Sequence, residues 1–188
     1  MNFQEYSSYF KHILSKDITQ QAPPYNNDDY FSYTRLNWSR MNRWFKKGEL
    51  SDEMLDVVHD INKPQRWIVI TEPWCGDAAH NIPFIEMLSW ENPMISISYE
   101  LRDSPPFRIE QYLTNNTKSV PKLIIQDAAG KDLLVWGPRP RDCQKLYNIL
   151  KKEEATFDKV KVEIQNWYNA NKGVDLQNEL TTLFLQKF

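Results

Sequence analysis

The sequence predicts an α/β fold with a mixed central sheet, helices on both faces, and helical extensions at both ends. Three observations predict it. A nearly continuous apolar run at 67–71 is typical of a strand buried on both faces. Two further apolar runs, 122–126 and 133–136, flank a turn at 127–130 and predict a β-hairpin. Apolar residues at helical spacing precede, separate and follow these strands, which is the pattern of a layered α/β domain.

The first 62 residues are predicted to form three helices. Phe3, Tyr6 and Phe10 give the first helix one apolar face, and the prolines at 23–24 end it. The polar run 26–29 offers N-caps for a second helix, which Gly48 ends, and a third begins at 51–53. The apolar positions of the second helix are expected to face the core, with ligand stacking as the alternative; they are Tyr30, Tyr33, Met41, Trp44 and Phe45.

The strand at 67–71 is followed by a predicted helix at 77–90, an alternating strand at 94–99, and a short helix opened by prolines 105–106. After the hairpin, one long helical stretch is expected from about residue 140 to Trp167, and a final short helix after Gly173. The domain prediction is a helical N-terminal extension at 1–62, a core at 63–150 and a helical C-terminal extension at 151–188.

Composition excludes several classes of protein. The two cysteines among 188 residues exclude a disulfide framework and a four-cysteine zinc site. The balance of 23 basic and 25 acidic residues argues against a nucleic-acid partner. No apolar run approaches the roughly 20 residues of a membrane span, and the first residues lack a secretory pattern. We therefore expect a cytoplasmic protein with no membrane partner, no metal and no cofactor.

The chemistry is predicted to lie in residues 71–80, TEPWCGDAAH, where a buried strand turns into a helix. Cys75 stands at this turn, and the free N–H groups and dipole of a helix start favour a thiolate. Gly76 allows the tight turn, and Trp74 supplies an apolar wall beside the sulfur. We expect Cys75 to be exposed and reactive; an inert cysteine is the alternative. Further along, Pro121 enters the hairpin after a bond of the type that can be cis.

These motifs resemble the thioredoxin superfamily over about 64–150. The resemblance rests on Trp74-Cys75-Gly76 before a helix, Pro83 within that helix, Val120-Pro121 before a hairpin, and Gly137 closing it. The sequence looks closest to small bacterial thioredoxin-like proteins with a Trp-Cys-Gly-Asp-Ala site. The resemblance implies that Cys75 is the nucleophile, Trp74 its flanking tryptophan and Pro121 the cis-proline. Val120 would then offer its backbone to an extended substrate chain.

The departures from the thioredoxin pattern are as informative as the matches. Ala78 replaces the resolving cysteine, so the two-thiol cycle is closed unless a thiol comes from elsewhere. Asp77 replaces the usual proline; its charge opposes a thiolate but stabilises the helix start. The buried acid that assists proton transfer in thioredoxin falls at Val69, which cannot titrate.

Other candidates keep two interpretations each. Cys143 is expected to be a packed apolar residue, with a distant resolving thiol as the alternative. His80 is expected at a solvated helix position, and a metal site with Cys75 and Asp77 is the weaker hypothesis. The segment 139–142 contains Arg139, Arg141 and Asp142. These residues resemble the helix start at which glutaredoxins bind glutathione, but arginines on a solvated loop fit equally. Glutaredoxins place a basic residue before their cysteine, where this chain has Glu72.

Two functions follow. The leading hypothesis is monothiol thiol–disulfide exchange, in which Cys75 attacks a disulfide-containing protein and an external low-molecular-weight thiol resolves the adduct. The alternative is a non-catalytic binding module that uses the groove of Trp74, Val120 and Pro121 for a peptide or protein partner. In either case the substrate-binding positions are predicted to be Trp74, Gly76, Asp77, Val120, Pro121 and Gly137.

Overall fold

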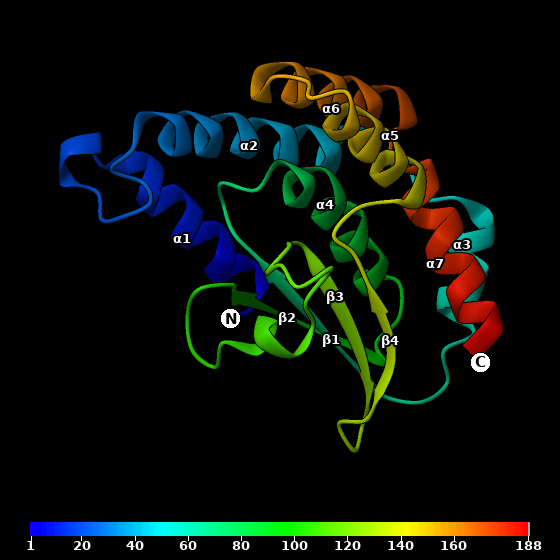
Figure 1. The fold of residues 1–188 in the computed structure, drawn as a ribbon. Helices are drawn as coiled ribbons and strands as arrows, with labels where there is room; N and C mark the ends of the chain where they lie inside the picture. The colour runs from blue at the N-terminus through cyan, green and yellow to red at the C-terminus, as the bar shows by residue number, and fades with distance from the viewer. Residues whose placement is uncertain (188) are drawn as a thin grey trace.

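The computed structural model describes residues 1–187, so Phe188, the last residue of the predicted C-terminal extension, lies outside the described residues. The helices surround a small central sheet (Figure 1). The elements in chain order are α1 (Phe3–Ser15), η1 (Ile18–Gln20), α2 (Asp28–Lys47), α3 (Asp52–His59), β1 (Gln65–Thr71), α4 (Gly76–Trp90), β2 (Ile95–Leu101), η2 (Arg108–Gln111), β3 (Lys122–Asp127), β4 (Asp132–Trp136), α5 (Arg141–Lys152), α6 (Phe157–Asn171) and α7 (Val174–Lys187).

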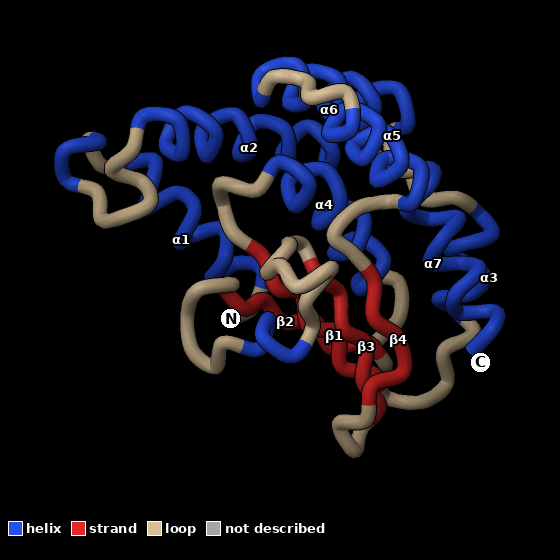
Figure 2. The backbone as a smooth tube through the Cα atoms, viewed as in Figure 1, coloured by secondary structure: helices blue, strands red, loops and turns tan. Residues whose placement is uncertain are grey.

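The four strands form one mixed sheet in the order β2-β1-β3-β4 (Figure 2). β1 pairs with β2 in parallel, and the β3–β4 hairpin adds to its other edge with antiparallel pairing. Every residue of β1 except Arg66 is buried, so both faces of this central strand are covered. The predicted α/β fold class, with a mixed sheet and added helices, is confirmed.

α2 begins and ends where the sequence predicts, and α3 begins where predicted, but α1 ends at Ser15, ahead of the prolines at 23–24 that were expected to end it. The Asn27 side chain caps α2 by accepting the backbone N–H groups of Asp29 and Tyr30, and the Gly48 N–H closes the helix on the carbonyl of Trp44. Ser51 caps α3 in the same way. Such caps satisfy N–H groups that a helix start leaves unpaired. Polar residues with short side chains therefore mark these helix starts in the sequence itself.

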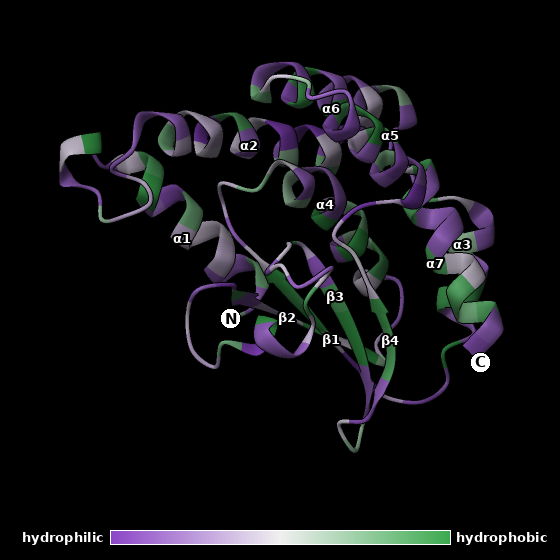
Figure 3. Ribbon diagram, viewed as in Figure 1, coloured by the Kyte–Doolittle hydropathy of each residue, from purple (hydrophilic) through white to green (hydrophobic). Residues whose placement is uncertain are grey.

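One hydrophobic core joins the sheet to helices from both ends of the chain. Tyr6 and Phe10 of α1 belong to the same buried cluster as the strands, and the Trp67 ring in β1 lies 6.0 Å from that of Phe184 in α7. Apolar residues concentrate in the strands and in α4, while the outer helices carry many hydrophilic residues (Figure 3). None of the helices within residues 1–187 is long and apolar enough to cross a membrane.

Two further predicted helices differ from the structure. The single long helix expected after residue 140 is two helices, because Glu154 adopts a left-handed φ of 55° and Thr156 caps a new start at α6. The helix expected from the prolines at 105–106 shrinks to the short η2, since Phe107 is also left-handed at φ 55°. The break turns α6 back over α2 and the start of α4.

Candidate functional site

The structure places Cys75 at the turn between β1 and α4, as predicted. Cys75 is the N-cap of α4: its Sγ accepts the backbone N–H of Ala78 at 3.4 Å. Its own N–H donates to the Glu72 carbonyl at 3.0 Å, which holds the turn. A sulfur atom at this point takes the role that a hydroxyl or carboxylate oxygen plays in ordinary N-caps.

The expectation that Cys75 is exposed is wrong. Its relative exposure is 7%, and its S–H donates to the Val120 carbonyl oxygen at 3.2 Å. Burial, followed by the charge of Asp77, raises the pKa of the thiol to about 12, although the Ala78 N–H and Arg139 favour the thiolate. Desolvation thus outweighs the helix start that the sequence analysis counted on to lower this pKa.

The Val120–Pro121 peptide bond is cis, and both residues are buried against Cys75. Gly137 has a φ of 114°, and a Cβ there would overlap the carbonyl oxygen of Pro121. Only glycine permits this close approach between the end of the hairpin and the strand entrance. These three predicted site residues therefore lie together on the strand side of the thiol, and the Val120 carbonyl already accepts the hydrogen bond of Cys75.

Asp77 is the centre of a polar network on the other side. Arg139 makes a two-point ion pair with it, with Nε donating to Oδ1 at 3.1 Å and Nη2 to Oδ2. The hydroxyl of Tyr168 in α6 donates to Oδ1 at 2.8 Å and accepts from Asn81 at 3.1 Å. Burial opposes the charge of Arg139, but the Asp77 carboxylate prevails and raises the pKa of the guanidinium. The acid that replaces the usual proline thus fixes α6 above α4.

Neither interpretation of the segment 139–142 describes it fully. Arg139 is neither on a solvated loop nor free to meet a ligand carboxylate, because Asp77 holds it. Arg141 and Asp142 are exposed, and Asp142 pairs with Lys145 at 2.7 Å. The glutaredoxin-like arrangement considered for this helix start is therefore not assembled from these three residues.

The prediction of a solvated His80 is wrong. His80 is 3% exposed, its Nδ1 accepts from the indole N–H of Trp44 at 2.8 Å, and its ring stacks on Tyr168 at 4.4 Å. Because Nδ1 accepts, the proton of the neutral ring is on Nε2, which faces the amide oxygen of Gln165 at 3.1 Å. Burial lowers the pKa of His80 to about 4. The covering side chains come from α2 and α6, which local sequence around His80 does not reveal.

The second cysteine is a packed residue, as predicted. Cys143 is 0% exposed, and burial raises the pKa of its thiol to about 12. Both cysteines are unpaired. Within residues 1–187, no group of three or more His, Cys, Asp and Glu side chains is arranged to hold a metal ion.

Glu72 is a buried acid that the sequence analysis did not single out for titration. It is 6% exposed, and burial raises the pKa of its carboxyl to about 7. The Asp103 N–H and the Tyr25 hydroxyl donate to its two oxygens at 3.3 and 3.4 Å. An acid immediately after an apolar strand was the available signal. Glu72 anchors the loop before Cys75 to the segment between α1 and α2.

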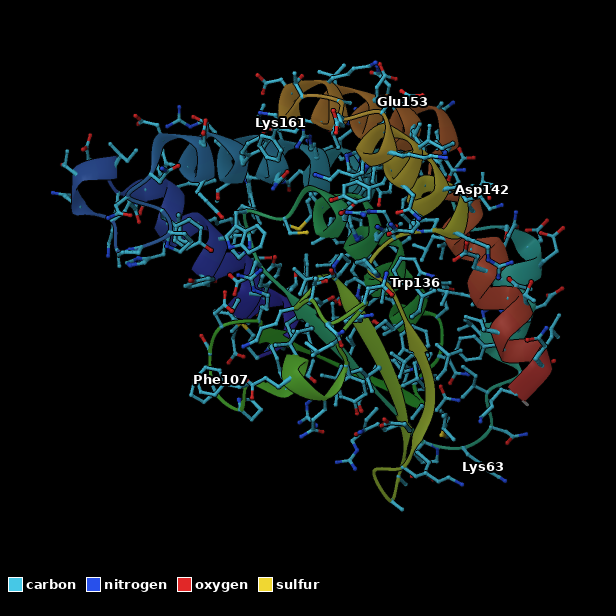
Figure 4. The ribbon with its side chains drawn as sticks, in the orientation of Figure 1. Lys63, Phe107, Trp136, Asp142, Glu153 and Lys161 are labelled. Carbon is cyan, nitrogen blue, oxygen red and sulfur yellow. The ribbon has the colours of Figure 1, made fainter. Side chains whose placement is uncertain are left out.

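A cavity of about 510 Å³ opens on the helix side of Cys75. We call it the Cys75 cavity. Its floor is the turn into α4, and its walls are α2 and α6, where Lys161 marks the edge of α6 above α2 (Figure 4). Its lining residues are Asn27, Asp29, Tyr30, Tyr33, Arg40, Trp74, Cys75, Gly76, Asp77, His80, Arg139, Tyr147, Phe157, Val160, Lys161, Ile164, Gln165 and Tyr168.

The cavity unites four of the predicted site residues, Trp74, Cys75, Gly76 and Asp77, but not Val120, Pro121 or Gly137. Trp74 is held between the Arg102 guanidinium, 4.6 Å from its ring, and the edge of Tyr30. The residues of α2 and α6 that form the walls of the cavity were not predicted from the sequence. Tyr30, expected in the core, is 41% exposed and lines the cavity instead. The helical spacing of the α6 residues was visible in the sequence, but their partner surface was not.

A mixed sheet flanked by helices, with a cysteine at the start of the helix after the central strand and a cis-proline beside it, defines a thioredoxin-fold protein. A family model described as thioredoxin matches residues 24–158. The chain belongs to the thioredoxin family.

Two solved structures share the fold. A protein of unknown function from Pseudomonas aeruginosa is 12% identical, with a TM-score of 0.57 over 90% of this chain and 89% of that one. An HIV epitope-scaffold is 13% identical, with a TM-score of 0.57 over 82% of this chain and 90% of that one. No curated protein is a significant match. At these identities the likeness extends to the fold alone.

Proposed function

We propose that this chain is a non-catalytic thioredoxin-fold binding protein that holds a ligand in the Cys75 cavity. The observation that carries the proposal is the cavity itself. Its volume of about 510 Å³ lies within the roughly 300–1,000 Å³ of small-molecule sites. Its lining combines apolar and aromatic side chains with a few fixed polar groups, which is the composition of such sites.

The state of Cys75 supports binding over catalysis. A nucleophilic cysteine needs a thiolate, and burial raises the pKa of Cys75 to about 12. Its S–H donates a hydrogen bond to the Val120 carbonyl, so ionisation of the thiol also breaks this hydrogen bond. Ala78 cannot resolve a mixed disulfide, and Cys143 is fully buried. In this proposal Cys75 is a neutral residue that lines the cavity. Its thiol stays unpaired because the protein acts in a reducing compartment such as the cytoplasm, where free thiols persist.

A second candidate is the monothiol exchange that the sequence predicts, and one contact favours it. The Ala78 N–H donates to Sγ, and Cys75 lines a cavity that a small disulfide can enter. In that reaction the thiolate attacks one sulfur of a disulfide, a Cys75 mixed disulfide forms, and the other sulfur leaves as a thiol. An external thiol then restores Cys75 by a second exchange.

Binding of an uncharged fluorescent probe, N-phenyl-1-naphthylamine, tests the proposal. The unmodified chain should bind it, and Ile164→Trp should weaken binding about tenfold or more, because the indole fills the cavity that Ile164 lines. The matched control is Val162→Trp, also on α6 but 56% exposed and outside the lining. Equal binding by the Ile164→Trp variant and the unmodified chain would overturn the proposal.

The same chain separates the two candidates. Incubation with cystamine at neutral pH, followed by intact mass and peptide mapping, should leave Cys75 unmodified while probe binding persists. Cys75→Ser should also retain probe binding. A rapid Cys75 adduct, released by added thiol, would support monothiol exchange instead.

A further inference from the structure

We propose that the ligand of the Cys75 cavity is a small organic anion with an aromatic or apolar body, whose acid group meets Arg40 beside the start of α4. This inference rests on the proposed function, since it names the chemistry of the ligand that the cavity receives. Arg40 projects from α2 and lines the cavity together with Cys75 and Gly76.

Arg40 carries a charge that the described residues leave uncompensated. Within residues 1–187 it donates to the neutral Asn37 amide oxygen, at 2.8 Å, and none of the ion pairs formed there includes it. Burial and then the positive charge of Arg43 lower the pKa of its guanidinium. A half-buried guanidinium that faces another cation, with no carboxylate, favours an external anion.

The other charged residues that line the cavity do not neutralise the charge of Arg40. Asp77 is held by Arg139 and Tyr168, and Lys161 pairs with Asp158 at 2.6 Å. Asp29 lies eleven residues before Arg40 on the same helix, about 16 Å along its axis at 1.5 Å per residue. His80 is buried as the neutral imidazole. Arg40 is therefore the charged lining residue with which an acid group of a ligand can form an ion pair.

The start of α4 strengthens the same position. A Cβ built on Gly76, the first residue of α4, would lie 3.8 Å from Nη1 of Arg40. The guanidinium is thus beside the positive end of a helix of 15 residues. Helix starts and arginine side chains both favour carboxylate, sulfonate and phosphate groups. Two independent features, one from α2 and one from α4, therefore point to an anion at one place.

Aromatic side chains provide for the rest of the ligand. Phe157 is 70% exposed and, with Tyr33, brackets Lys161, whose Nζ lies 4.6 and 4.7 Å from the two ring centres. This bracket links α6 to α2 at the cavity edge. Ile164 and Val160 extend the apolar wall inside. Exposed rings at the edge and aliphatic groups within suit a flat or apolar body attached to the acid.

A matched pair of probes tests the charge. 1-Anilinonaphthalene-8-sulfonate and N-phenyl-1-naphthylamine share an aromatic body and differ by one sulfonate. The unmodified chain should bind the sulfonate about tenfold more tightly, the size of one charge-assisted contact. Arg40→Gln should remove that preference and leave the uncharged probe unaffected. Arg40→Lys should keep part of it, and added salt should reduce it.

The control for a general loss of positive charge is Arg35→Gln. Arg35 is on α2 as well, but it stacks on Phe31 at 5.1 Å and lies outside the cavity lining. Its variant should keep the preference for the sulfonate. Unfolding temperatures of all variants, measured by circular dichroism, identify any that fail to fold.

The outcomes separate the two proposals. If both probes bind, and Arg40→Gln leaves their affinity ratio unchanged, the anion inference is wrong and the binding cavity stands. If neither probe binds, or Ile164→Trp has no effect on either, the proposed function itself is wrong. Loss of the sulfonate preference in Arg40→Gln alone, with Arg35→Gln unchanged, supports both.

Discussion

The two sides of Cys75 differ in what surrounds them. On the strand side, the thiol donates a hydrogen bond to the Val120 carbonyl, and Gly137 lies close against the Pro121 carbonyl. On the helix side, α2 and α6 stand apart and leave the Cys75 cavity. The thioredoxin resemblance predicts substrate on the strand side, at Val120 and Pro121. The structure instead leaves space where helices beyond the resemblance meet the core.

The predicted site residues are therefore divided between the two sides of the thiol. Cys75 lies beside the cis-bonded segment Val120–Pro121, and the Val120 carbonyl accepts a hydrogen bond from its thiol. Asp77 then serves the helix side, because it anchors Arg139 and Tyr168.

Removing the anchor of the helix side should have the largest effect. Asp77→Ala leaves Arg139 buried without its partner, and breaking a buried ion pair in this way costs about 3–5 kcal/mol. The loss is measured by urea unfolding. The control, Asp142→Ala, removes an exposed acid and should change stability by about 0.5 kcal/mol or less. A cost below about 1 kcal/mol for Asp77→Ala would show that the network does not hold α6.

His80 should make the helix side sensitive to acid. Its pKa is about 4 in the folded chain against an ordinary 6.5, so the unfolded chain binds the proton first. The stabilisation is therefore present above pH 6.5 and is lost as pH falls toward 4, by about 3 kcal/mol at 1.36 kcal/mol per pKa unit. The measurement is the free energy of unfolding against pH for the unmodified chain and His80→Gln.

The buried Glu72 changes stability with pH in the opposite direction to His80. The effect of His80 is therefore read from the difference in unfolding free energy between the unmodified chain and His80→Gln. The Glu72 pKa of about 7, against an ordinary 4.5, gives a stabilisation present below pH 4.5 that is lost as pH rises through 7. Both proteins carry Glu72, so its contribution cancels in their difference. Parallel curves for the two proteins between pH 4 and 6.5 would contradict the account of His80.

On the strand side, Gly137→Ala should cost about 2 kcal/mol or more. The added Cβ overlaps the Pro121 carbonyl at a positive φ that alanine rarely adopts. Gly130→Ala is the control, since Gly130 also has a positive φ but its Cβ would meet only the side chain of Arg66, at 3.1 Å. Urea unfolding compares them. An equal loss of stability at both positions would contradict the close approach of Gly137 to the Pro121 carbonyl.

A smaller effect is expected from Tyr168→Phe. The variant loses the hydroxyl that joins Asp77 to Asn81, and a lost buried hydrogen bond costs about 1–2 kcal/mol. Tyr147→Phe, which changes another tyrosine of the cavity lining, should stay within about 0.5 kcal/mol. The same unfolding assay measures both. If Tyr147→Phe costs as much as Tyr168→Phe, the hydroxyl network is not the source of the effect.

Much of the fold could be predicted because its signals are local. The apolar run of β1, the turn of the hairpin and the caps at Asn27 and Ser51 each depend on a few adjacent residues. The position of Cys75 at the start of α4 was predictable for the same reason. The break before α6 was harder, because a left-handed Glu154 leaves no strong mark in the sequence.

The properties of the site could not be predicted in the same way. The pKa of Cys75 and the burial of His80 depend on which side chains cover them, and those come from Val120, Trp44 and Tyr168, far away in the sequence. A helix start lowers a thiol pKa only if water or positive charge is also present. Tertiary contacts therefore reversed the expected chemistry of a residue that was correctly located.

The central claim is that Cys75 is a protonated lining residue rather than a nucleophile. The most direct test is the rate of Cys75 alkylation by iodoacetamide between pH 6 and 10, followed by peptide mapping and compared with the urea-unfolded chain. With a pKa of about 12, the folded rate at neutral pH should be about a hundredfold lower and still rising at pH 10. A rate that reaches its plateau below pH 8.5 would contradict the account.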